Sequence, residues 1–379
     1  MRSFINTTTA TLCVSLFAAM PASADPFLDE VVDFQSTIFY FEAGVPGVVV
    51  AAVKGDDAFV TGMGETRKGN GVTPTGDSTL RIGSITKAFT GQVLAQLVAD
   101  GLVSFTTPAA ELVDGELGKA LADWPSVSLV QLATHSGGLP REVPRAKAED
   151  PADPYATLTT EAFTSWFNDH QPLYTPGRNM LYSNFGFDIL SAALSGAIGS
   201  PYAEYLDETI LSPLNMNDTG FERSTTNAEL AMYGHGFDGE PLPHIISGKM
   251  NTGSGGLTST ANDMVKWIKW HLNEKADEPE TRLLDHAVYF QRDHFDQVQS
   301  MDESGRLDGA GLGWVAMYET DDHPFILQKA GGMQGELSYV ALAPAHDVGV
   351  FISINEYNFS AALGMASFAN DLVATLSGY

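Results

Sequence analysis

Segments with the pattern of β-strands lie near both ends of this chain. Residues 47–53 (GVVVAAV) form a continuous apolar run, and residues 58–63 follow after a turn at Gly55, as in a β-hairpin. Four further runs of this kind occupy residues 311–318, 324–328, 337–342 and 348–354. The simplest assembly is one antiparallel sheet built from N-terminal and C-terminal strands.

The chain between these strands is predicted to be mostly helical. Phe89, Val93 and Leu97 repeat at helical spacing in a helix expected from Ser84 to about Asp100. Further helices are predicted at residues 186–198, 202–211, from Thr260 onward, and at 360–376. Prolines interrupt residues 140–154, which are expected to form a loop.

Together these segments predict an α+β fold. We expect an antiparallel sheet flanked by helices, formed by residues 25–83 and 305–379. Residues 84–304 would form a mostly helical insertion. A cleft between sheet and insertion is the default place for a functional site.

The N-terminus has the order of a secretory signal peptide. Arg2 supplies a positive charge, residues 10–20 are apolar but too short to span a bilayer, and Ala22-Ser23-Ala24 resembles a cleavage site. The alternative is a buried N-terminal helix. A signal peptide at residues 1–24 predicts a periplasmic or secreted protein, and its removal would take away Cys13, the only cysteine of the chain.

The composition is strongly acidic. The chain has 47 Asp and Glu against 20 Lys and Arg, a formal net charge of −27, with the acids spread along its length. Such a charge excludes nucleic acid as a partner and favours a solvated acidic surface. No segment after the leader is expected to be long and apolar enough to span a membrane.

Ser84 and Lys87 form the first candidate catalytic pair. Positions three apart share a helix face, so the hydroxyl and the amine can meet. A serine needs a base to become a nucleophile, and lysine can serve only if burial or nearby positive charge lowers its pKa. The alternative is an N-cap serine with a solvated lysine.

Tyr182 and Asn184 form the second candidate pair. A tyrosine near cations can relay a proton to a leaving group, and an asparagine can hold both a substrate amide and the lysine head. The alternative is a core tyrosine before the helix at 186–198, with Asn184 as its cap.

The third candidate segment is Lys329-Ala330-Gly331-Gly332, just after the strand predicted at 324–328. A lysine here would add positive charge to the cleft, and glycines allow the backbone to approach a ligand and donate an N–H to an oxyanion. The alternative is a glycine-rich hairpin turn.

Taken in order, Ser-x-x-Lys, Tyr-x-Asn and Lys-x-Gly resemble the motifs of the serine β-lactamase and penicillin-binding protein superfamily, in its class C-like branch. The resemblance is to periplasmic D-alanyl-D-alanine carboxypeptidases and endopeptidases, and it covers residues 25–379. It extends to residues 65–70 (ETRKGN), 132–135 (LATH), 139–142 (LPRE), 311–315 (GLGWV) and 328–329 (QK).

The resemblance implies a β-lactamase/transpeptidase-like fold and a serine hydrolase that forms an acyl-enzyme on peptidoglycan peptides and binds β-lactams. It implies Ser84 as nucleophile and Lys87 as base, with Tyr182 as proton shuttle. The implied substrate contacts are Asn184, Lys329, Gly331 and Gly332, and the N–H groups of Ser84 and Gly332 would form the oxyanion hole.

This chain departs from the third motif of the family, which has threonine where Ala330 stands. Loss of that hydroxyl removes a contact to a substrate carboxylate, at a cost of about 1–3 kcal/mol of binding. Substrate preference therefore stays open between a peptidase and a β-lactamase or esterase on the same scaffold. A binding module without catalysis is the alternative from another class.

Other residues that could take part in catalysis are less strongly indicated by the sequence. Glu142 follows the turn at Pro140 and either lines the cleft or is solvated. His135 is a possible base, although packing in a loop is the favoured interpretation. The nine histidines are scattered without metal-ligand spacing, so no metal and no other cofactor is expected.

Overall fold

The computed structural model describes residues 26–224, 226–246, 250–273, 278–301 and 306–379. The predicted signal peptide lies outside these residues. The first described element is a helix, α1 (Pro26–Ala43), which the sequence analysis did not predict.

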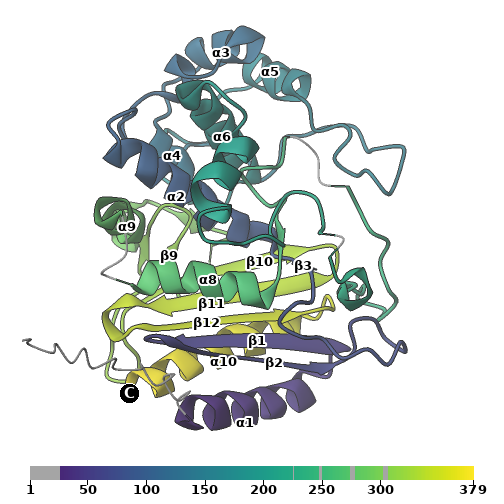
Figure 1. Cartoon of the computed structure of the whole chain (residues 1–379). Helices are drawn as coiled ribbons and strands as arrows, with labels where there is room; N and C mark the ends of the chain where they lie inside the picture. The colour runs from purple at the N-terminus through teal and green to yellow at the C-terminus, as the bar shows by residue number, and fades with distance from the viewer. Residues whose placement is uncertain (1–25, 225, 247–249, 274–277, 302–305) are drawn as a thin grey trace, which may run out of the picture.

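An eight-stranded antiparallel sheet forms the centre of the fold (Figure 1). Its strands, in spatial order, are β2 (Asp57–Gly64), β1 (Gly47–Lys54), β12 (Val348–Ile354), β11 (Glu336–Ala343), β10 (Ile326–Met333), β9 (Val315–Met317), β8 (Gly309–Ala310) and β6 (Phe290–Gln291). Val48 of β1 lies opposite Ile354 of β12. The prediction of one sheet joining the two ends of the chain is therefore confirmed.

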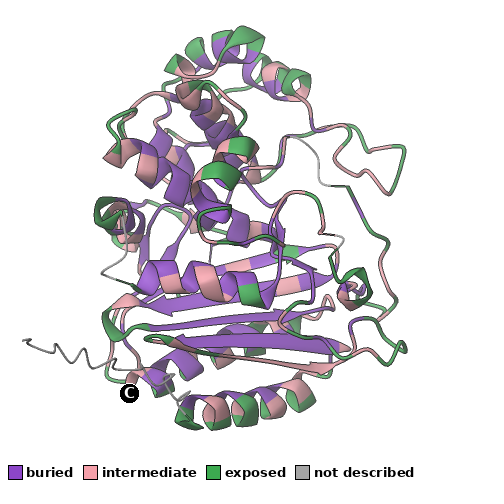
Figure 2. Cartoon of the chain, in the orientation of Figure 1, coloured by how far each residue is buried: buried purple, intermediate pink, exposed green. Residues whose placement is uncertain are grey.

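Both faces of this sheet are covered by helices. α1 and α10 (Phe359–Ser377) pack on one face, and α8 (Ala261–Leu272) packs on the other (Figure 1). Strand β1 contributes alternate residues to the two cores, Val49 to one and Val48 to the other. Burial on both sides explains why 47–53 is a continuous apolar run rather than an alternating one (Figure 2).

A mostly helical layer stands above the sheet in Figure 1. Its helices are α2 (Thr86–Ala99), α3 (Gly115–Ala122), α4 (Leu129–Ala133), α5 (Thr160–Asp169), α6 (Asn184–Ile198), α7 (Tyr202–Leu206) and α9 (Pro279–His286). A π-helical turn, Asp207–Leu211, continues α7. Together the two cover the helix predicted at 202–211. Short 3₁₀ turns lie at Gly83–Ile85, Ala109–Glu111, Ala228–Leu230, Arg292–His294 and Pro344–His346.

Two pairs of short strands form small sheets of their own beside the main sheet. β3 (Leu80–Arg81) pairs with β5 (Thr258–Ser259), and β4 (Met180–Leu181) pairs with β7 (Val298–Gln299). Within the predicted insertion 84–304, α8 packs on the sheet and β6 belongs to it. The division into a sheet part and an insertion at residues 84 and 304 stays a prediction.

Helix α10 corrects one expectation. Its length and hydropathy are enough to cross a membrane, whereas the sequence analysis expected no such segment after the leader. Met365, Ala369 and Leu372 of this helix are buried in the core on the sheet. The apolar character of α10 is therefore accounted for by its packing against β11 and β12.

A buried ion-pair network ties β3, which leads to the Ser84 turn, to β11. The Glu336 carboxylate accepts from the Arg223 guanidinium at 3.1 Å and lies 4.0 Å from Nε of Arg81. Its Oε1 also accepts the backbone N–H of Arg81 at 3.2 Å. These contacts fix the approach of the chain to the turn that carries Ser84.

Candidate active site

Ser84 lies in the 3₁₀ turn Gly83–Ile85, between β3 and α2. The sequence placed it at the first position of the helix, whereas α2 begins two residues later at Thr86. The N-cap residue of α2 is Ile85, and no side chain caps it. The interpretation of Ser84 as an N-cap is therefore wrong, and its hydroxyl is available for chemistry.

Lys87 is fully buried beside Ser84. Its Nζ lies 3.1 Å from Ser84 Oγ and 2.6 Å from Asn184 Oδ1, and it donates to the carbonyl of Ser254 at 2.5 Å. The alternative of a solvated lysine is therefore wrong. The i, i+3 spacing brings hydroxyl and amine together, as predicted.

Burial lowers the pKa of Lys87 to about 7. The carboxyl groups of Asp188 and Glu142 act against this shift, and the Arg141 guanidinium adds to it. The positive charge that lowers the pKa of Lys87 comes from Arg141, which the sequence did not indicate. At neutral pH a large fraction of the amine is uncharged and can accept a proton.

Asp188 was missed by the sequence analysis. It lies on α6 four residues after Asn184, hence on the same helix face, and is buried. Burial raises its pKa well above the usual value, while a hydrogen bond from Ser254 and the charge of Lys87 act in the opposite direction. The i, i+4 spacing from Asn184 is the signal that could have identified it.

The ring of Tyr182 is surrounded by three basic side chains. The side-chain heads of Arg141, Lys87 and Lys329 lie 4.7, 4.9 and 5.1 Å from its centroid. His135 stacks on the same ring with 4.5 Å between centroids. The tyrosine near cations that the sequence predicted is therefore present, and it carries an unpredicted neighbour in Arg141.

Asn184 bridges the lysine to an acid. Its Oδ1 accepts from Lys87, and its Nδ2 donates to Glu142 Oε1 at 2.5 Å. The cap of α6 is Ser183, whose hydroxyl accepts from Gly186 N at 2.8 Å. The alternative of Asn184 as cap is therefore wrong, and Glu142 is joined to the cleft through the Asn184 amide.

His135 supports the site from behind. Its Nδ1 accepts the backbone N–H of Ser183 at 3.0 Å, and its carbonyl accepts the N–H of Leu181 at 3.0 Å. Burial lowers the pKa of this imidazole well below its usual value, so it is neutral. These contacts support the packing interpretation over a role as base.

Lys329, Gly331 and Gly332 lie within strand β10 rather than after it. Pairing with β9 ends at Gln328, so the rest of this edge of β10 faces the Ser84 turn. A Cβ on Gly331 would lie 1.9 Å from the carbonyl oxygen of Ile82. Glycine at this position permits a close approach of β10 to the Ser84 turn. The alternative interpretation, a hairpin turn, would not explain this approach.

The real hairpin turn follows two residues downstream of Gly332. Gln334 and Gly335 both have positive φ, +54° and +81°, as a two-residue type I′ turn requires. Gly83 also has a positive φ of +50°, and a Cβ there would lie 2.5 Å from Gly332 N. The backbones of Ser84 and Gly332 are thus held side by side.

We expect Gly331→Ala to separate these two backbones. The added methyl collides with main chain on the Ser84 turn, so the melting temperature and the rate of serine acylation should both fall, the rate by at least about tenfold. Gly220→Ala is the matched control, because its Cβ would meet no atom closer than 3.9 Å. Circular dichroism melting of both variants tests the close approach of β10 to the Ser84 turn. A wild-type melting temperature for Gly331→Ala would contradict it.

A cavity of about 610 Å³ opens in front of these groups. Ser84, Tyr182, Lys329 and the backbone of residues 330–332 line one part of it. Its other part is lined by apolar and aromatic side chains: Phe237, Met301, Tyr357, Phe359 and Leu363. Phe237 and Phe359 are 67% and 76% exposed, and their tilted rings lie 5.1 Å apart between centroids, so an apolar wall faces the cavity.

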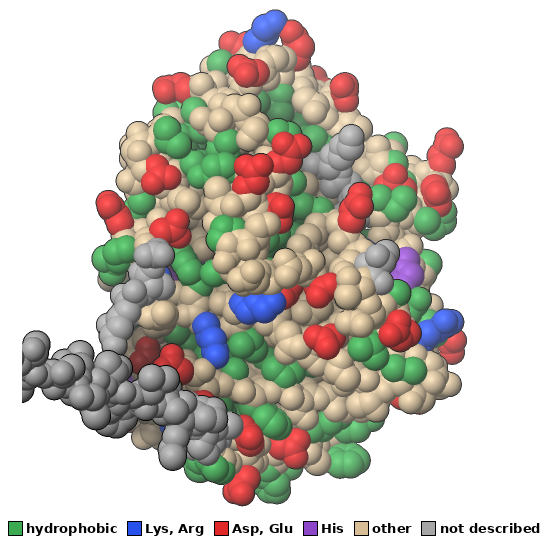
Figure 3. Space-filling view, in the orientation of Figure 1, with side chains coloured by type: hydrophobic (Ala, Val, Ile, Leu, Met, Phe, Trp, Pro, Cys, Tyr) green, Lys and Arg blue, Asp and Glu red, His purple; other side chains and the backbone are tan. Residues whose placement is uncertain are grey.

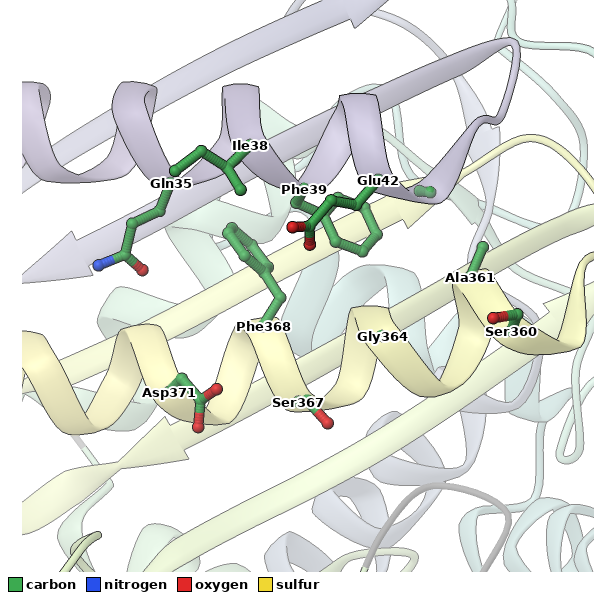
Figure 4. Close-up of a pocket in the computed structure, with 11 residues that line it drawn as sticks. Gln35, Ile38, Phe39, Glu42, Ser360, Ala361, Gly364, Ser367, Phe368 and Asp371 are labelled. Carbon is green, nitrogen blue, oxygen red and sulfur yellow. The ribbon is translucent and has the colours of Figure 1, made fainter.

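A second hollow, of about 430 Å³, lies between α1 and α10 (Figure 4). Phe39 and Phe368 meet across it, with Glu42 and Asp371 at its rim. None of the residues that the sequence predicted as a site lines it. Acidic side chains are scattered over the face drawn in Figure 3, in agreement with a solvated acidic surface.

Comparison with known proteins gives one consistent family. A family model described as Beta-lactamase matches residues 21–373. The chain is 32% identical to the D-alanyl-D-alanine-carboxypeptidase/endopeptidase AmpH of Escherichia coli K12, over 97% of this chain and 96% of that relative. It is 21% identical to a beta-lactamase of Pseudomonas fluorescens, over 86% of this chain and 93% of the other.

A solved structure gives the same result for the fold. The crystal structure of a beta-lactamase/D-alanine carboxypeptidase from Yersinia pestis, complexed with citrate, superimposes with a TM-score of 0.82. It is 29% identical in sequence and covers 92% of this chain and 98% of the other. The fold predicted from the resemblance is confirmed.

Proposed function

The chain belongs to the beta-lactamase family, and from this premise we propose that it is a serine-type D-alanyl-D-alanine carboxypeptidase and endopeptidase that works through an acyl-enzyme on Ser84. One observation carries the proposal: a fully buried lysine amine lies 3.1 Å from the hydroxyl of an accessible serine. Peptidoglycan peptides would be the substrates, and β-lactams would acylate the same serine.

Acylation begins with transfer of the Ser84 proton to the uncharged amine of Lys87. Ser84 Oγ then forms a bond to the carbonyl carbon of the penultimate D-alanine. The N–H groups of Ser84 and Gly332 stabilise the negative charge that develops on the carbonyl oxygen. As the C–N bond breaks, Tyr182 passes a proton from Lys87 to the leaving amine, and D-alanine departs.

Deacylation repeats these steps with water. Water gives a proton to the base and attacks the ester carbon, and the Ser84 oxygen leaves with the proton returned through Lys87. Lys329 and Arg141 supply positive charge beside the Tyr182 ring, which favours an anionic substrate end. Asn184 holds the lysine head and offers an amide to the substrate.

Release of D-alanine from a muropeptide pentapeptide tests the proposal. The mature enzyme should release one D-alanine per peptide, and a cross-linked dimer should be cleaved at the same serine. Absence of release, together with rapid cleavage of an ester, would contradict a peptidase.

A second candidate function, a β-lactamase or esterase at the same serine, is favoured by Ala330 and the apolar wall. Neither offers a hydrogen bond to a substrate carboxylate, and the wall fits an apolar group. A fluorescent penicillin separates the candidates: a stable label supports the peptidase, and rapid loss of label with drug hydrolysis supports the β-lactamase. A folded protein without label and without ester turnover would be a binding module.

Ala330→Thr should shift preference toward substrates that end in a carboxylate. The new hydroxyl lines the cavity beside Lys329 and can donate to that carboxylate. One such hydrogen bond corresponds to about a five- to hundredfold gain in kcat/KM for a D-Ala-D-Ala peptide. Ala330→Val adds a similar volume without a hydroxyl, and an equal gain in that control would contradict the reason given.

We also propose a periplasmic location, because residues 1–24 have the order of a cleaved signal peptide. Detection of a mature N-terminus at Asp25 in a periplasmic extract would support it.

A further inference from the structure

Three potential metal ligands meet outside the catalytic cleft, between α8 and α9. They are His271 from α8 and Asp285 and His286 from the end of α9. His271 Nδ1 lies 2.9 Å from His286 Nε2 and 3.6 Å from Asp285 Oδ2. The histidines lack a recognised metal-ligand spacing in the sequence, which predicts no metal, and the fold brings these two together.

The donor set is that of a borderline divalent ion. Two imidazoles and a carboxylate, with a water in the fourth position, form a common Zn²⁺ coordination shell. Bonds of about 2.1 Å at tetrahedral angles place ligand atoms about 3.4 Å apart. The 3.6 Å separation of His271 and Asp285 is close to that value, and the two imidazoles, which lie at a hydrogen-bond distance of 2.9 Å, would move apart slightly on binding. His271 and Asp285 are buried, while His286 is partly exposed and offers an entry path.

The carboxylate of Asp285 is oriented by a neighbouring side chain. Asp285 Oδ2 accepts the indole N–H of Trp314 at 3.0 Å, which orients the carboxylate as outer hydrogen bonds do in metal sites. The other oxygen, Oδ1, is buried without a hydrogen-bond partner among the described residues.

We propose that His271, Asp285 and His286 bind one divalent transition-metal ion, with Zn²⁺ as the best match. The ion would fasten α9 to α8 behind the catalytic helix. Trp314 stacks on Trp267 at 5.6 Å, and Trp267 stacks on Phe89 of α2 at 4.2 Å. The site therefore supports the helix of Lys87 without touching the substrate, and its role is structural.

Calorimetric titration of the tag-free, chelator-treated mature protein with Zn²⁺ tests the proposal. We expect one ion per chain and a rise in melting temperature on binding. Co²⁺ in place of Zn²⁺ should give the visible absorption of a four-coordinate site. His286→Gln should weaken binding by more than about 100-fold, because it removes one of three protein ligands.

The matched control is His346→Gln, which removes an exposed histidine in the 3₁₀ turn Pro344–His346 and should leave the affinity unchanged. Circular dichroism establishes that each variant is folded. Failure of the folded wild-type protein to bind Zn²⁺ would overturn the proposal and leave a cluster of neutral, hydrogen-bonded side chains. Equal affinity in His286→Gln and wild type would overturn it as well, because the ion would then bind elsewhere.

Discussion

Ser84→Ala is expected to abolish both D-alanine release and covalent labelling by penicillin. The variant lacks the hydroxyl that attacks the substrate carbonyl, so kcat should fall by about 10⁴-fold or more. The side chain is half-buried and its hydroxyl accepts a hydrogen bond from Lys87, whose loss does not remove core packing, so the fold should persist. Pentapeptide hydrolysis followed by chromatography gives the rate.

The control for this variant is Ser36→Ala, which removes another buried hydroxyl, on α1 and far from the cleft in sequence and structure. That variant should keep wild-type activity. Residual turnover of Ser84→Ala above about one hundredth of the wild-type rate would contradict a nucleophilic role for Ser84.

Lys87→Met is expected to have the next largest effect. Methionine fills a similar volume but cannot accept the Ser84 proton, and a general base commonly contributes about 10²–10⁴-fold to the rate. Acylation by penicillin should therefore slow by about 10³-fold. Stopped-flow labelling measures this step without interference from deacylation.

The pH dependence of the wild-type enzyme provides an independent measurement of the same residue. Only the uncharged amine can act as base, and burial lowers the pKa of Lys87 to about 7. The acylation rate should therefore rise tenfold per pH unit below pH 7 and level off above about pH 8. An acylation rate that still rises near pH 10, where an exposed lysine titrates, would be incompatible with a buried base.

Much of the fold could be predicted from the sequence. The strands β1 and β12 are continuous apolar runs because both of their faces are buried, and this made them easy to recognise. Helix α1 was missed because Phe27, Phe34 and Phe41 are exposed, which blurs the apolar face of the helix. A local pattern of apolar residues predicts which side chains are buried, and these three apolar side chains are exposed instead.

The residues of the candidate site could be predicted from the sequence, but the charges that surround them could not. Spacing alone could bring Ser84 to Lys87, whereas the charges around Lys87 come from distant segments that carry Asp188 and Arg141. The end of β10 was misplaced because Gly331 and Gly332 resemble a turn. Their actual role, to let the strand pass close to the Ser84 turn, depends on tertiary packing that a single sequence does not record.

Mass mapping of the covalent adduct is the most direct test of the central claim. The mature protein is incubated with penicillin, digested, and its peptides are examined by tandem mass spectrometry. We predict one modified peptide, with the added mass on Ser84 and none in the Ser84→Ala variant. An adduct on any other residue, or an unmodified Ser84 in an enzyme that still hydrolyses its substrate, would contradict the account.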